Sequence, residues 1–246
     1  MEHMEGATVA ELAVTSLAAV RVFEKYGIDY CCGGKRPLED ACLRNGQNVQ
    51  VVQQELEAAL QSKPAPEYDW NNAPLHALIE HIVAVHHEYL RRELPAIQAR
   101  LDKVYRVYNQ RYGPTLEGLP EVFAELRDEL EPHMQKEEAI LFPAIRAIEW
   151  ATNLGTVLPK MPFGNIANPI RMMEAEHDHA GSALQRIREI TGNFEVPAYA
   201  CVTYKALMSG LAELEADLHM HIHLENNVLF RRADQLENAL AVAGKN

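Results

Sequence analysis

The sequence of 246 residues is short of basic side chains and of long apolar runs, and each shortage excludes a class of protein. It has 23 Lys and Arg against 35 Asp and Glu, so its formal net charge is -12. A surface this acidic repels the phosphates of nucleic acids and anionic lipids, so we expect neither as a partner. No apolar run approaches the roughly 18 residues that span a bilayer, and MEHMEGATVAEL at the N-terminus lacks a signal-peptide pattern. We therefore expect a cytoplasmic protein without a membrane segment.

Cysteines and strand-like patterns are also scarce. Four cysteines in a chain of this length do not make a disulfide framework, and the cytoplasm keeps thiols reduced. Thirteen glycines and thirteen prolines are ordinary numbers, so disorder is not indicated. No stretch has a convincing strand pattern. With 48% hydrophobic residues the chain can bury a core, and the predicted fold class is all-α.

A proline-rich stretch divides the helical patterns into two groups. KPAPEYDWNNAP, which begins at Lys63, has three prolines and no periodicity, and we assign 63–73 as a linker. Residues 1–62 before it are expected to form a small helical module with helices over 8–26, 37–44 and 48–62. Residues 74–246 after it are expected to form an up-down-up-down four-helix bundle, with Asn168 as the N-cap before Pro169. Its predicted helices are 74–111, 119–151, 168–193 and 197–237.

Two similar segments carry most of the candidate chemistry. HMQKEEAILF begins at His133 and HIHLENNVLF begins at His221. Each places a glutamate four residues after the histidine, Glu137 and Glu225, so each pair shares one helix face. The apolar stripe of each helix steps by three and four residues and runs through its pair; the first stripe continues to Ile140. Both pairs are therefore predicted in the core, where an unpaired carboxylate is very costly and requires a cation.

The other two long helices supply histidines on their apolar faces. His177 is in phase with the stripe of the third helix, and His87 is in phase with Val83 in the first. His86 lies at the edge of that stripe, and periodicity favours His87 as the ligand without excluding His86. At about 1.5 Å per residue, the candidate side chains fall in one layer of the bundle. The candidate metal ligands are His87, His133, Glu137, His177, His221 and Glu225.

Four imidazoles and two carboxylates in one core layer predict a two-metal site. This donor set suits iron, with manganese or zinc as alternatives. Six protein ligands leave positions open for oxide, water, O2 or NO. The alternative interpretation is that each histidine is an ordinary core residue satisfied by hydrogen bonds. Four histidines in register favour the metal site over this alternative. Glu138 and Glu176 stand beside ligands and are expected to be solvated rather than supporting. The remaining histidines are interpreted as surface or supporting residues: His76, His81, His179, His219 and His223.

These positions resemble a known family. His87, HMQKE from His133, EHD at 176–178 and HxxLENNVLF from His221 resemble the hemerythrin-like domain of the RIC family, the di-iron repair proteins of iron–sulfur clusters. YGIDYCCGG resembles the region that precedes this domain in the family. The resemblance implies a cytoplasmic homodimer with two non-haem iron ions in an oxo- and carboxylate-bridged centre, with Glu137 and Glu225 as bridges. It further implies that the protein restores damaged iron–sulfur (Fe–S) proteins under nitrosative and oxidative stress by supplying iron.

Two rival functions stay open at this point. One is an enzyme, a di-iron nitric oxide reductase or oxidase that uses the open positions for chemistry. The other is a hemerythrin-like sensor or carrier that binds NO or O2 reversibly. A hemerythrin carrier typically has a fifth histidine ligand, and no further histidine falls on a core stripe.

IDYCCGG at 28–34 is the remaining motif. A disulfide between neighbouring cysteines closes a strained ring, and a separate metal site would need two more soft ligands where the module offers only Cys42. A tight turn with small side chains is the plain interpretation. We interpret Cys31 and Cys32 instead as an accessory thiol pair for NO handling, redox exchange or iron transfer. Cys42 and Cys201 are expected to be inert helix cysteines.

Overall fold

The fold was analysed in a computed structural model that describes residues 6–61, 69–112, 116–158 and 160–243. Within these ranges every regular element is a helix. The only β-type pairings there are two isolated bridges, Thr8 with Pro37 and Met161 with Gly164. The predicted all-α class is confirmed.

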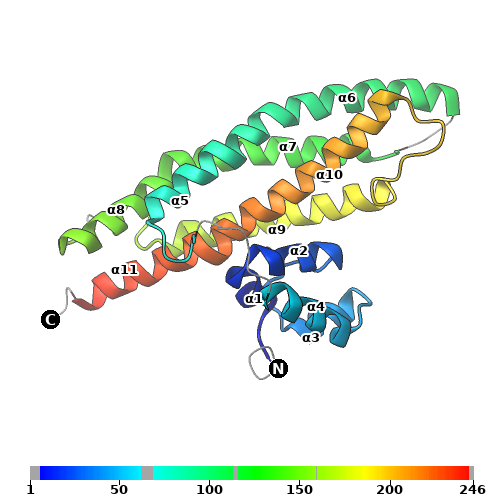
Figure 1. The fold of residues 1–246 in the computed structure, drawn as a ribbon. Coiled ribbons are helices and arrows are strands. Elements are labelled where there is room, and N and C mark those ends of the chain that lie inside the picture. The colour runs from blue at the N-terminus through cyan, green and yellow to red at the C-terminus, as the bar shows by residue number, and fades with distance from the viewer. Residues whose placement is uncertain (1–5, 62–68, 113–115, 159, 244–246) are drawn as a thin grey trace.

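Four long antiparallel helical rods form the larger part of the molecule (Figure 1). Each rod corresponds to one of the four long helical patterns, and three of the rods contain a π-helical segment, labelled η. In chain order the elements are α5 (Leu75–His81), η1 (Ile82–His87) and α6 (Glu88–Tyr112); α7 (Leu119–Lys136), η2 (Glu137–Leu141) and α8 (Phe142–Leu154); α9 (Ala167–Ile190); and α10 (Val202–His223), η3 (Leu224–Phe230) and α11 (Arg231–Ala243).

Two hydrophobic clusters lie along the bundle with a polar layer between them. One cluster includes Leu90 and Leu130 and extends toward the α6–α7 end. The other includes Ile82 and Leu141 and extends toward the end formed by α8 and α11. The predicted ligands stand in each rod between members of the two clusters. Apolar packing on both sides therefore fixes the level at which the rods present their polar side chains.

In η1 and η2 the π-helical turn moves one core position by one residue. A π-turn contains one residue more than an α-turn, and it occurs often at functional sites. Ile140, which the unbroken stripe placed in the core, is 49% exposed, whereas Leu141 is 1% exposed. Val83 is likewise only partly buried, and Ile82 takes the core position instead. The prediction for Ile140 was wrong because it assumed a regular α-helix through Glu137.

Several helix ends differ from the prediction, and three of them are informative. The first pattern is two helices, α1 (Val9–Thr15) and α2 (Leu17–Lys25), because Ser16 is extended and its hydroxyl accepts the N–H of Ala18 at 2.9 Å. Asn168 lies inside the first turn of α9, whose N-cap is Ile166. Its amide donates instead to the Phe163 carbonyl at 2.7 Å, in the preceding turn. The fourth rod starts at Val202 rather than at residue 197.

The N-terminal helices form a small module against the bundle. It contains α1 and α2 followed by α3 (Leu38–Arg44) and α4 (Val49–Gln61), and it has a hydrophobic cluster of its own that Ile222 of α10 joins. In Figure 1 the module lies alongside the middle of α9 and the C-terminal end of α10. Most of the predicted linker 63–73 lies outside the described residues.

Polar contacts attach the module to the bundle near the polar layer. The amide of Asn227 in η3 donates to the Tyr30 carbonyl at 3.0 Å. Lys35 forms an ion pair with Glu174 of α9 at 3.0 Å. The turn that contains the two adjacent cysteines therefore lies directly against α9 and η3.

The burial pattern in η2 predicts different effects on stability for substitutions at two neighbouring residues. Replacing buried Leu141 with Ala should lower the free energy of unfolding by about 2–5 kcal/mol, whereas Ile140→Ala should change it by less than about 0.5 kcal/mol. Denaturant unfolding of both variants measures the difference. An Ile140→Ala variant that loses as much stability as Leu141→Ala would contradict the shifted register.

Candidate metal centre

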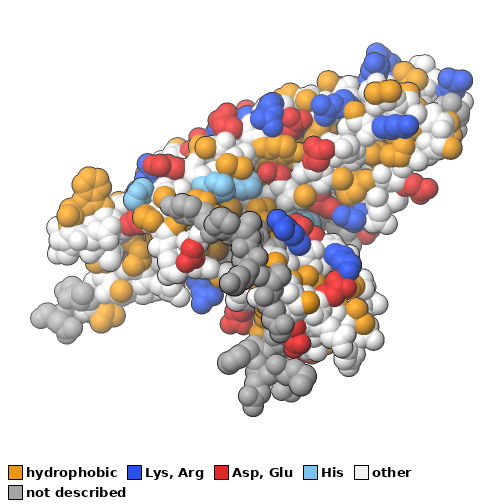
Figure 2. Space-filling model, in the orientation of Figure 1, with side chains coloured by type: hydrophobic (Ala, Val, Ile, Leu, Met, Phe, Trp, Pro, Cys, Tyr) orange, Lys and Arg blue, Asp and Glu red, His pale blue; other side chains and the backbone are white. Residues whose placement is uncertain are grey.

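The bundle brings all the predicted ligand side chains to one buried layer. They come from η1, α7, η2, α9, α10 and η3, and none is more than 3% exposed. On the face drawn in Figure 2, histidine reaches the surface only in small patches. The clustered residues are His87, His133, Glu137, His177, His221 and Glu225.

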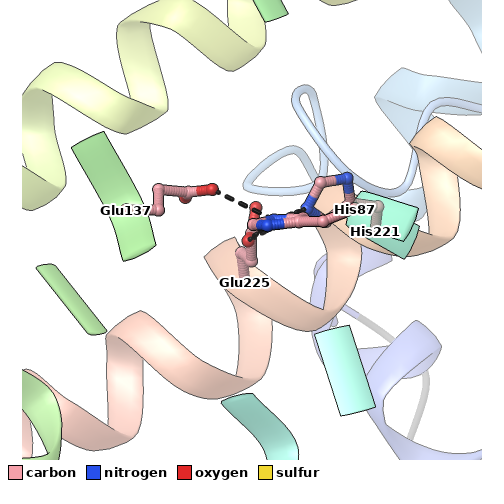
Figure 3. A group of neighbouring side chains, drawn as sticks. All are labelled: His87, Glu137, His221 and Glu225. Atoms are coloured by element: carbon pink, nitrogen blue, oxygen red, sulfur yellow. Dashed lines mark hydrogen bonds and ion pairs between the residues drawn. The ribbon is translucent and has the colours of Figure 1, made fainter. Parts of the chain in front are cut away.

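The converging nitrogen and oxygen atoms form two groups of four. Both groups contain Glu137 and Glu225, and within each group all ligand atoms lie within 4.8 Å of one another. The first group is drawn in Figure 3, where the two carboxylates approach from separate rods. We call the two groups the 87/221 half and the 133/177 half after their histidines, His87 with His221 and His133 with His177.

The outer ring nitrogens determine the protonation of three imidazoles. His87 Nδ1 lies 2.6 Å from Glu138 Oε1, and His133 Nδ1 lies 2.8 Å from Glu176 Oε2. A carboxylate can only accept a hydrogen bond, so each ring proton resides on Nδ1 and each Nε2 carries a lone pair. His177 Nδ1 lies 2.8 Å from the side-chain oxygen of Asn226, with the same consequence.

The inner ring nitrogens face one another across each half. His133 Nε2 lies 3.1 Å from His177 Nε2, and His87 Nε2 lies 3.2 Å from His221 Nε2. Burial and the proximity of His177 lower the pKa of His133 to about 4, so this ring is neutral near pH 7. Between His133 and His177, two lone pairs directed at each other would repel unless a proton or a metal cation lies between them.

Glu137 is a buried carboxylate without hydrogen bonds. Neither of its oxygens has a hydrogen-bond partner in the part of the chain that the structure describes. The nearest ring nitrogens, of His87 and His133, lie 3.4 and 3.5 Å from Glu137 Oε2 and form ion-pair contacts only. Burial and the nearby Glu225 raise the pKa of Glu137 well above its usual range. Without a cation, burial of this side chain would lower the stability of the fold considerably.

Glu225 is held between the two halves. Its Oε1 lies 3.0 Å from His221 Nε2, and its Oε2 lies 3.2 Å from His177 Nε2. Burial alone would raise the pKa of Glu225, but His221 and His177 hold it well below its usual range. Ring nitrogens and carboxylate oxygens that converge in a buried core fit bound cations, and imidazole and carboxylate donors suit iron.

The outer carboxylates were expected to be solvated, and that prediction was wrong. Besides His87, Glu138 accepts a hydrogen bond from Arg91 at 2.6 Å. Besides His133, Glu176 contacts the Lys136 ammonium. Each carboxylate thus links an inner histidine to a basic side chain at the surface of the bundle. Sequence reasoning could place these glutamates beside ligands but could not see which neighbouring rod they face.

Two family models match this chain. The hemerythrin HHE cation binding domain matches residues 78–233, a range that contains every residue of the converging cluster. ScdA_N, a domain of unknown function (DUF542), matches residues 5–60. The iron–sulfur cluster repair proteins YtfE of Escherichia coli K12 (DH10B), E. coli O8 (IAI1) and Shigella boydii serotype 4 (Sb227) are each 41% identical over 226 residues. These matches cover 92% of this chain and 95% of each relative.

The chain belongs to the RIC family. Its larger part is a cation binding domain of the hemerythrin type. None of its described helices has the length and apolar character needed to cross a bilayer.

Other histidines of this RIC-family chain are also buried. The structure places His87 rather than His86 in the cluster, but His86 is itself only 4% exposed. Its Nδ1 lies 2.9 Å from Asp217 Oδ1, and its ring is parallel to that of His221 at 5.3 Å. His223 is buried as well, and burial lowers its pKa to about 4. Sequence periodicity placed His86 only at the edge of a stripe and gave no signal for His223, which lies off the stripe of its helix.

Cys31 and Cys32 form a turn beside the metal layer but contribute no atom to it. Asp29 accepts hydrogen bonds from the backbone N–H groups of both cysteines at 3.0 Å. The two sulfurs are 3.7 Å apart and unbonded, and the contact with Cys32 together with burial raises the pKa of Cys31 well above its usual range. The Cys32 thiol donates to the His177 carbonyl at 3.3 Å. Gly181 permits this approach, because a Cβ there would lie 3.2 Å from the sulfur.

The expectation that only Cys42 could join these thiols in a metal site was incomplete. Asp29 Oδ1 lies 3.4 Å from the Cys31 sulfur, and the ligand atoms of Asp29, Cys31 and Cys32 lie within 4.8 Å of one another. The sequence showed Asp29 two residues before the pair, but only the turn aims its carboxylate back at the thiols.

A groove of about 460 Å³ lies between α1 of the module and the bundle. Its wall includes Asn226, which accepts from His177, and Phe230, whose ring is parallel to that of His177. The groove therefore ends on the residues that back the 133/177 half, not on the ligand atoms themselves.

Cys201 is not an inert helix cysteine as predicted. It is exposed and stands at the N-cap of α10. The Tyr108 hydroxyl, which accepts the Cys201 N–H at 2.7 Å, and the first turn of α10 lie beside the thiol and lower its pKa to about 7. A thiolate is favoured at a helix N-terminus because the unpaired N–H groups there stabilise negative charge.

The lowered pKa of the exposed Cys201 thiol predicts that alkylation is selective for this cysteine. The rate of iodoacetamide reaction at Cys201 should rise with pH around a midpoint of about 7, whereas Cys42, whose pKa burial raises, should react slowly throughout. Peptide mass spectrometry measures both rates. Tyr108→Phe should move the Cys201 midpoint upward. A wild-type midpoint above about 8, as for a free thiol, would contradict the assignment.

Proposed function

We propose that this protein holds two iron ions in its buried cluster and supplies iron to damaged iron–sulfur clusters. The observation that carries the proposal is the pair of four-donor groups that share Glu137 and Glu225, with inner ring nitrogens facing one another at 3.1 and 3.2 Å. The proposed ligands are His87, His133, Glu137, His177, His221 and Glu225.

The shared carboxylates support two ions rather than one. Each half offers two imidazole nitrogens of its own, and both halves use Glu137 and Glu225. Two carboxylates common to both groups can bridge a pair of cations, which would neutralise charges that otherwise repel in a buried position. When bound, the iron pair supplies open coordination positions and access to two oxidation states.

The protein residues account for both retention and release of iron. Neutral imidazoles and carboxylates are harder ligands than the cysteine thiolates of an iron–sulfur cluster. Iron held by them can therefore pass to a thiolate site as cargo. Glu138 and Glu176 orient two of the rings and raise their donor strength. The name of the YtfE relatives, iron–sulfur cluster repair protein, supports the same role here.

The rival functions have less support. A carrier with a fifth histidine would need another imidazole in the donor groups, and His86, the nearest buried candidate, lies outside both. Nitric oxide reduction at the same ions remains an alternative activity that turnover of NO to N2O would favour. Assembly as a homodimer and location in the cytoplasm remain predictions.

Removing either shared carboxylate should remove the iron. After anaerobic loading with ferrous iron, the wild type should bind two irons per chain, and Glu137→Leu and Glu225→Leu should each bind fewer than one. Reactivation of an NO-damaged iron–sulfur enzyme should fall in parallel. Metal analysis and the repair assay give the two readouts. Full loading and full repair by both variants would refute the proposed ligands.

Two controls separate ligand loss from misfolding. Glu237→Leu removes a buried carboxylate of α11 that accepts the Ile166 N–H at 2.9 Å, far along the rod from the cluster, and should keep both irons. In the presence of a chelator, Glu137→Leu should be more stable than wild type by about 1–4 kcal/mol, because a buried carboxyl group without a hydrogen-bond partner is replaced by an apolar side chain.

The thiol pair should affect repair but not iron binding. A Cys31→Ala, Cys32→Ala double variant should retain two irons per chain, because neither sulfur belongs to the donor groups, and should lose part of its repair activity. Cys42→Ala, a buried cysteine of the same module, is the matched control and should retain both. Loss of iron from the double variant would overturn this division of roles.

A further inference from the structure

The four inner histidines differ in what their outer ring nitrogens contact. The outer nitrogens of His87, His133 and His177 each face an oxygen acceptor at 2.6–2.8 Å. His221 Nδ1 is buried, and no described residue accepts a hydrogen bond from it. The 87/221 half therefore contains one supported and one unsupported imidazole, whereas both imidazoles of the 133/177 half are supported.

An acceptor behind a ligand histidine strengthens its bond to a metal. Coordination through Nε2 requires the ring proton to reside on Nδ1, and an acceptor there stabilises that tautomer, orients the ring and raises its basicity. Loss of such an acceptor typically costs 10–100-fold in metal affinity. Because both halves share the same two carboxylates, the second imidazole is what distinguishes them.

A carboxylate that could support His221 stands on the same helix but is held by another ring. Asp217 stands four residues before His221 on α10, so the two side chains share one helix face. Asp217 Oδ1 is bonded instead to His86 Nδ1 at 2.9 Å. The His86 ring lies parallel to the His221 ring at 5.3 Å, with an angle of 6° between the planes. The remaining polar atoms, Asp217 Oδ2 and His86 Nε2, are also buried without a partner among the described residues.

We propose that the 87/221 half gives up its iron first, because His86 holds the carboxylate that would otherwise support His221. This inference rests on the proposed function, since it presupposes two bound irons. It makes His86 and Asp217 positioning residues that set which iron is available for donation.

Access to solvent alone favours the opposite order. A small hollow of about 10 Å³ is lined by His133, His177 and Glu176 and lies over the 133/177 half. If entry of the acceptor decided the order, that half would lose its iron first. The two explanations can therefore be separated by assigning each kinetic phase of iron loss to a half.

The experiment follows iron loss from the fully loaded diferrous protein. Mixed with excess ferrozine, wild type should release its irons in two phases of one iron each, read from the absorbance of the chelate. Glu138→Gln weakens the support of His87 and should accelerate only the fast phase. Glu176→Gln, the matched substitution behind His133, should accelerate only the slow phase.

His86→Phe tests the cause directly. Phenylalanine keeps a ring beside His221 but cannot bond Asp217, which is then free to accept the His221 N–H. The fast phase should slow by about 10-fold or more. Asp217→Asn added to His86→Phe should restore the fast phase, because the new acceptor is weakened again. A merely structural role of His86 would not produce this reversal.

The outcomes distinguish this inference from the proposed function. Acceleration of the fast phase by Glu176→Gln, or a single phase for both irons, would overturn the order proposed here. A His86→Phe variant with an unchanged fast phase would overturn the role of His86. Failure of wild type to bind two irons would instead overturn the proposed function itself.

Discussion

The structure depends on a charge constraint in the bundle core. Two carboxylates and the inner nitrogens of four imidazoles converge in a buried layer, and no described residue donates a hydrogen bond to Glu137 to offset its burial. A cluster of this kind is unfavourable without cations and favourable with them. The hydrophobic clusters on both sides of the layer supply the packing that holds the rods at the level where the donors meet. Metal binding and the stability of this layer are therefore coupled.

The π-helical segments meet the geometric requirement of that layer. Each of the three begins or ends within a residue or so of a donor: His87 ends η1, Glu137 begins η2 and Glu225 is the second residue of η3. The extra residue in each turn rotates the side chains beyond the donor relative to those before it. Donors can thus point to the centre while the helix on each side keeps its own apolar face buried. Only α9, whose single donor is His177, crosses the layer as a regular helix.

The surroundings of the cluster are unequal although the inner donors are nearly symmetric. Glu138 and Glu176 connect one histidine of each half to a basic side chain at the surface, and Asn226 supports His177. His221 Nδ1 has no acceptor among the described residues, and its ring lies parallel to that of His86. The module with the adjacent cysteines contacts the backbone of His177 through Cys32. The thiols therefore border the better supported half, and the less supported half lies on the side of Asp217. Differences outside the donor set are sufficient to make two chemically similar positions behave differently.

The pattern of residues alone was enough to predict the helices of the bundle and the side chains that can meet in its core. Steps of three and four residues place His133 with Glu137, and His221 with Glu225, on apolar stripes, and counting along the rods puts the candidates in one layer. These inferences need only the local geometry of one helix at a time. The tertiary structure decided the contacts between rods: the supporting role of Glu138 and Glu176, the burial of His86 and the exposure of Ile140. Those outcomes depend on where an extra residue rotates a helix and on which neighbour it then faces, and the pattern within one helix contains neither.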